Sequence, residues 1–118
     1  MPSVKITNKE TFKRSLENLE KKLIAAAMQG LEESGGAIVD EARERVPVKT
    51  GRLKDSIGLA TDEDALSVTV KADTPYAKFV EFGTFKTPAR PFFLPAVEHE
   101  RPKTAGRVAD AIKKAMGQ

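Results

Sequence analysis

Apolar residues recur from residue 12 to residue 46 at spacings that are mostly three or four, which is the period of one helical face. Pro47 disfavours helical backbone at the residue before it and ends the pattern. The sequence therefore predicts one long helix over residues 8–46, opened by a capping box from Thr7 to Glu10.

A helix over residues 8–45 would be about 57 Å long. A single domain of 118 residues has too small a core to cover a helix of that length. Part of the apolar stripe must then be covered by another subunit, unless glycines inside the helix bend or loosen it. Those glycines are Gly30, Gly35 and Gly36.

The next stretch, residues 47–73, predicts a turn and a β-hairpin. Residues 47–51 have turn composition, and residues 61–64 are a second, acidic turn. In residues 66–72, apolar side chains alternate with polar ones, as in a strand with one buried face. Residues 53–57 fit either a helical turn or a strand, and the sequence leaves that choice open.

Residues 75–90 predict a short helix and an exposed loop. Pro75 is a favoured first helical residue and Gly83 is suited to a helix end, so the helix should cover residues 75–82. The Thr, Lys and Pro content of residues 83–90 indicates an exposed loop.

The last stretch, residues 91–116, predicts a C-terminal helix that begins at Pro91 and is kinked or split near Pro102. Residues 1–118 are then a single α+β domain. A long N-terminal helix and a C-terminal helix pack on a small, mainly antiparallel sheet.

The charge balance points to no obvious ligand. Lys and Arg total 20 against 17 acids, for a net charge of +3. The densest basic stretch, residues 43–54, favours a solvated face or an acidic protein partner over nucleic acid. Without cysteine the chain has no disulfide or thiolate metal site, and no apolar run approaches the length of a membrane span.

No grouping of side chains predicts catalysis, a cofactor site or a metal site. His99 is the only histidine, and its neighbours Glu98 and Glu100 would not share its helical face. Glu81 lies among aromatic residues, where a general acid is conceivable, but an ion pair with an Arg or Lys is favoured. A hydrolase that uses Glu81 and Asp55 ranks below the other interpretations, so we expect no enzyme.

Aromatic residues are concentrated in one part of the chain. Four of the seven lie in residues 76–85 and two more at 92 and 93, with no nucleophile or metal ligand set nearby. Such a cluster indicates packing and protein contact. Five of these rings are expected in the core rather than at an interface: Tyr76, Phe79, Phe82, Phe92 and Phe93.

Three ordered segments carry a resemblance: residues 46–57 (VPVKTGRLKDSI), 76–84 (YAKFVEFGT) and 90–98 (RPFFLPAVE). Together they resemble a family of small tail-completion and head–tail joining proteins of long-tailed bacteriophages and prophages. The resemblance implies a structural virion protein at the head-proximal end of the tail, made in the host cytoplasm. It implies rings, often of about six copies, between the connector and tail-tube proteins, with no catalysis or cofactor.

The motif positions are also the candidate subunit contacts: Gly51, Leu53, Tyr76, Phe79, Glu81, Phe82, Gly83, Thr84, Phe85, Lys86, Pro91 and Phe92. We expect residues 83–90 and the long first helix to supply the two patches of a ring contact. The alternative function is a small DNA-binding module encoded in a prophage, which would use residues 43–54 against phosphates and form a monomer or dimer.

Overall fold

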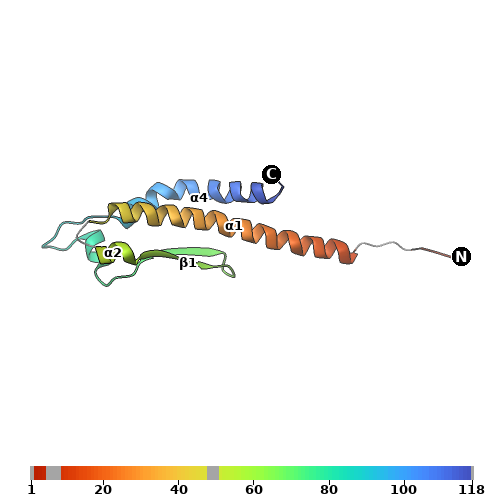
Figure 1. Ribbon diagram of the computed structural model, residues 1–118, viewed down its shortest axis with the longest axis horizontal. Helices are drawn as coiled ribbons and strands as arrows, with labels where there is room; N and C mark the ends of the chain where they lie inside the picture. The colour runs from red at the N-terminus through yellow and green to blue at the C-terminus, as the bar shows by residue number, and fades with distance from the viewer. Residues whose placement is uncertain (1, 5–8, 48–50, 118) are drawn as a thin grey trace.

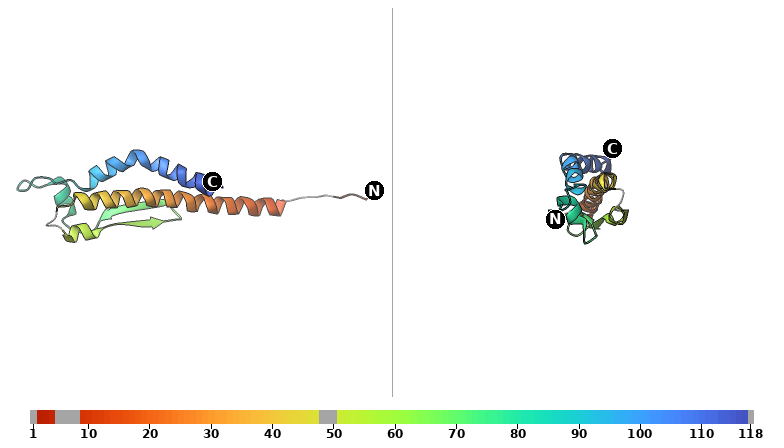
Figure 2. Two further views of the ribbon diagram at one scale, coloured as in Figure 1. Left: turned by 45° about the horizontal axis from the view of Figure 1, so that its top comes forward. Right: turned by 90° about the vertical axis from the view of Figure 1, so that its left-hand side faces the viewer.

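The computed structural model describes residues 2–4, 9–47 and 51–117. It shows an α+β fold in which the longest helix lies in the middle, with a β-hairpin along one side and the C-terminal helix along the other (Figures 1 and 2). The elements are α1 (Lys9–Arg45), α2 (Gly51–Ser56), β1 (Ile57–Asp62), β2 (Ser67–Ala72), α3 (Ala77–Phe82) and α4 (Phe93–Ala115). The predicted fold class is confirmed.

The long first helix forms without a break. It runs from Lys9 to Arg45, while Asn8 and the Thr7 half of the predicted capping box lie outside the described residues. The glycines that could have loosened the helix do not interrupt it. Gly30 and Gly35 are buried, and α4 approaches α1 closely at Gly30 and the hairpin at Gly35.

The glycines permit these close approaches because they lack a side chain. A Cβ on Gly30 would lie 2.5 Å from the Cα of Val108 in α4. A Cβ on Gly35 would lie 2.9 Å from Cγ1 of Val68 in β2. α1 is therefore packed on two sides, by α4 and by the hairpin, in its C-terminal half.

The hairpin is antiparallel, with Ile57 opposite Ala72 and Asp62 opposite Ser67. The predicted strand is thus confirmed from Ser67 onward, but Leu66 belongs to the turn rather than to the strand. Residues 53–57, for which the sequence allowed either a helical turn or a strand, contain both. Residues 53–56 belong to helix α2, which ends at Ser56, and strand β1 begins at Ile57. Gly51 starts α2 instead of ending a turn.

The predicted short helix is present as α3, but it begins at Ala77, two residues after the predicted Pro75. It ends at Gly83, whose φ of 75° suits glycine. The last helix begins at Phe93, two residues after the predicted Pro91. It continues through Pro102 as one helix and bends in its middle (Figure 2). A kink rather than a split follows because proline removes one backbone hydrogen bond while the rest of the helix is packed on α1.

The core lies around the C-terminal half of α1. Its buried members are Val39, Ala42, Val46, Leu53, Ile57, Phe92 and Ala96. The N-terminal part of α1 projects past both α4 and the hairpin (Figure 1). No helix in the described ranges is long and apolar enough to cross a membrane.

Candidate assembly surfaces

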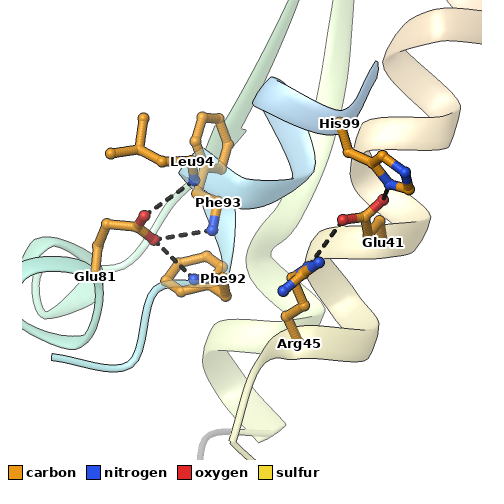
Figure 3. Close-up of polar contacts among 7 residues, drawn as sticks. All are labelled: Glu41, Arg45, Glu81, Phe92, Phe93, Leu94 and His99. Carbon is orange, nitrogen blue, oxygen red and sulfur yellow. Dashed lines mark hydrogen bonds and ion pairs between the residues drawn. The ribbon is translucent and has the colours of Figure 1, made fainter. Parts of the chain in front are cut away.

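Glu81 holds the start of α4. Its side chain is buried, and Oε1 accepts the backbone N–H groups of Phe92 at 3.0 Å and Phe93 at 2.9 Å. Oε2 accepts the N–H of Leu94 at 2.9 Å (Figure 3). The first N–H groups of a helix have no partner within it, and the helix dipole favours a carboxylate there.

This arrangement corrects the predicted partner of Glu81. The carboxylate is paired with backbone N–H groups rather than with an Arg or Lys. Both of its oxygens are occupied by the cap, so Glu81 positions a helix and is not placed as a reacting acid. Asp55, the other residue of the hydrolase interpretation, is exposed on α2.

The aromatic cluster divides into a buried and an exposed set. Phe92 is 1% exposed, and Tyr76 and Phe93 are half-buried against the same core. Phe79 and Phe82, however, are 50% and 68% exposed, so the prediction that both are core residues was wrong. They lie on α3, a helix too short to bury a full face.

Two apolar hollows flank α3. One, of about 420 Å³, lies between α3 and the following loop and is lined by Phe79, Val80 and Pro88 among others. The other, of about 350 Å³, is bounded by β2, α3 and the start of α4, and Phe82 stands at its wall. Exposed rings beside apolar hollows are typical of protein-contact surfaces.

Residues 83–90, termed here the 83–90 loop, are held in a defined conformation. The N–H of Thr84 donates to the carbonyl of Thr87 at 2.8 Å, and Oγ1 of Thr84 accepts from the N–H groups of Lys86 and Thr87. The N–H of Arg90 donates to the carbonyl of Val80 at 2.8 Å and closes the loop on α3.

The tip of this loop presents two side chains to solvent. Phe85 is 96% exposed, and Nζ of Lys86 lies 5.5 Å from the centre of its ring. Gly83 allows the tight return of the chain, since a Cβ there would lie 2.6 Å from the backbone N of Ala89. The predicted exposed loop is confirmed.

A second apolar surface runs along the free end of α1. Every residue from 9 to 22 is exposed, and we call this segment the α1 overhang. Phe12, Leu16 and Leu19 are 63%, 50% and 37% exposed along it. Their spacing continues the helical face on which Ala26 and Gly30 are buried. The apolar stripe therefore extends along α1 beyond the end of α4, which covers the rest of it (Figure 1).

The basic stretch at residues 43–54 is partly engaged within the chain. Nη2 of Arg43 donates to the carbonyl of Ile57 at 2.8 Å. Nε of Arg45 lies 2.8 Å from Oε2 of Glu41, whose Oε1 lies 2.7 Å from Nδ1 of His99 (Figure 3). The hydrogen bond with His99, followed by that with Arg45, lowers the pKa of Glu41.

The other residues singled out from the sequence lie either in the core or at exposed positions on helices or near their starts. Leu53 is fully buried in the core, while Gly51 and Pro91 are exposed at or near the starts of α2 and α4. His99 is exposed on α4, as expected of a helical surface histidine. Nowhere in the described part of the chain do three His, Asp or Glu side chains gather as a metal site would require.

These features define a class of protein: a small α+β domain whose conspicuous surfaces are apolar and suited to contact with other proteins. A family profile described as "Bacteriophage HK97-gp10, putative tail-component" matches residues 10–83. The chain therefore belongs to this family of phage tail components, and its place is in the virion. No curated protein and no solved structure matches significantly.

Proposed function

We propose that this tail component acts in tail completion and head–tail joining, as a ring of about six copies at the head-proximal end of the tail. Its partners there are further copies of itself and the connector and tail-tube proteins. Its role is structural and not catalytic. Family membership supports a tail role, and the surfaces described above support self-assembly.

The observation that carries the proposal is the α1 overhang. Phe12, Leu16 and Leu19 form an apolar stripe that no other part of the described chain covers. Leaving such a stripe in water is unfavourable, and burial contributes roughly 25 cal/mol per Å² of apolar surface. A second chain is the simplest cover for it.

A ring needs contacts between two different patches of the subunit, because a patch that meets its own copy closes a dimer. The α1 overhang and the 83–90 loop each supply one side of such a contact, and they lie at opposite ends of the molecule (Figure 1). Each offers large apolar side chains on a defined backbone element.

The test is the mass of the purified protein in solution. Light scattering on a sizing column, across a range of protein and salt concentrations, should give a species near six subunits or a rise toward one. Negative-stain images of that species should show closed rings. A monomer at every concentration would contradict self-assembly and would call for a DNA-binding assay across salt concentrations.

A further inference from the structure

We propose that the 83–90 loop of one copy docks on the β1–β2 turn of a second copy, with Phe85 packed against Leu66. This inference rests on the proposed ring and names the surface that receives the loop. It concerns the turn residues 63–66 and the adjoining Asp62 at the end of β1, a part of the hairpin that neither the motifs nor the core explains.

Leu66 is the first observation. It has a φ of 51°, the one positive φ outside glycine among the described residues. Leucine is disfavoured in that conformation, where glycine or asparagine is usual. Its side chain is also 45% exposed, so it adds little to the core of the monomer. Strain at an exposed apolar residue is the pattern of a side chain kept for contact.

Three acidic residues precede Leu66 within four positions of the chain. Asp62, Glu63 and Asp64 are all exposed. Oδ1 of Asp62 accepts the N–H of Ala65 at 3.1 Å, and the N–H of Leu66 donates to the carbonyl of Glu63 at 3.1 Å. The turn is thus a fixed apolar point with an acidic rim.

The 83–90 loop has the opposite character. Its apolar point is Phe85, and its charged side chains are Lys86 and Arg90, both exposed. It contains no Asp or Glu. An apolar centre with a basic rim therefore faces an apolar centre with an acidic rim, which is the complementarity expected of a specific contact.

The geometry of one chain excludes an internal contact between these patches. The loop lies beyond α3 at one end of the core, and the turn lies at the far end of the hairpin (Figure 1). The α1 overhang is a poorer match for the loop, since it carries more Lys and Arg than Glu. A second copy of the chain supplies the turn, and the resulting contact joins two different patches, as a ring requires.

Cysteine pairing tests the contact directly, because the chain has no native cysteine. Phe85→Cys protein is mixed with Leu66→Cys protein under mild oxidation, and disulfides are mapped by peptide mass spectrometry. A bond between positions 66 and 85 of different chains is expected. The control pairs Phe85→Cys with Met116→Cys, an exposed position on neither patch, and should give little product.

Charge reversal gives an independent test. Lys86→Glu and Glu63→Lys should each weaken association roughly tenfold, and the double variant should restore it, because the pair is attractive again. Asp110→Lys, on an exposed part of α4, is the matched control and should leave association unchanged. Leu66→Gly should weaken association while the melting temperature stays level or rises, since it relieves the backbone.

The results of these experiments test the 66–85 contact independently of the proposed ring. A 66–85 bond in open chains without rings would support the contact and count against the ring. Rings that form without a 66–85 bond, and that Leu66→Gly leaves intact, would support the ring and overturn the contact. Absence of the bond at every protein concentration overturns the contact in either case.

Discussion

Oε1 of Glu81 accepts the backbone N–H of Phe92 at 3.0 Å and so ties the last turn of α3 to the start of α4. The two residues flank the 83–90 loop in the chain, and Phe92 is among the most buried side chains of the core. The cap therefore fixes both ends of an exposed loop to the folded domain. The conformation of the loop depends on it.

Replacement of Glu81 by alanine should lower the free energy of unfolding by about 1–3 kcal/mol, because three N–H groups at a buried helix start lose their acceptor. Urea denaturation measures the loss. Glu98→Gln is the control, since Glu98 is exposed and 3.4 Å from Arg101, and it should change stability by less than about 0.5 kcal/mol. Equal stability of the two variants would contradict the capping role.

Gly30→Ala should destabilise the protein by about 1–3 kcal/mol, because the new methyl group would meet the backbone of Val108 and Arg107. Gly36→Ala is the matched change six residues later on the same helix. A Cβ there meets nothing within 4 Å, so helix propensity should raise stability by about 0.5–1 kcal/mol. Thermal denaturation distinguishes the two variants. A similar change in melting temperature for both would contradict a close approach of α4 to α1 at Gly30.

The sequence was sufficient for features set by local periodicity and turn chemistry. The length of α1, the alternation in β2 and the helix end at Gly83 all follow from residues near one another in the chain. The exposed 83–90 loop was found in the same way. The close approach of α4 to α1 at Gly30 was not, because it depends on the distant Val108.

The remaining errors have the same tertiary origin. Glu81 was assigned a charged partner, but its acceptor role exists only once α3 lies beside the start of α4. Phe79 and Phe82 were assigned to the core because ring size alone does not say which face of a short helix is covered. Leu66 looked like the first residue of a strand, and only its φ reveals a turn.

Stability should fall in acid through Glu100. Arg107 hydrogen-bonds this buried carboxylate and, with Ser34 at 2.9 Å, lowers its pKa below the ordinary value of 4.5. A lowered pKa in the folded state stabilises the protein above the unfolded pKa, and this contribution is lost as pH falls through the folded pKa. Urea denaturation at a series of pH values from neutral down through this range should show the loss.

Glu100→Gln isolates that contribution. It should cost about 1–3 kcal/mol at neutral pH, where Arg107 loses its charged acceptor, and the pH dependence below pH 4.5 should become shallower. Some dependence should remain, because the pKa of Glu41 is also lowered. An unchanged pH profile would show that Glu100 does not contribute to it.

Truncation of the loop tip should separate assembly from folding. The Phe85→Ala, Lys86→Ala double variant removes an almost fully exposed ring and the amine above it. The free energy of unfolding should therefore change by less than about 0.5 kcal/mol. Assembly measured by light scattering should weaken. Loss of folding equal to the loss of assembly would contradict a contact role for these two side chains.

The α1 overhang should likewise be needed for assembly and not for folding. Leu16 is 50% exposed in the monomer, so Leu16→Gln should leave the unfolding transition nearly unchanged while it removes apolar surface from the stripe. Arg14→Gln is the control, because residue 14 lies on the opposite face of the helix from Phe12 and Leu16. Light scattering should show a smaller species for Leu16→Gln alone. If both variants assemble like the unaltered chain, the stripe is not a subunit contact, and the ring must be held by other surfaces.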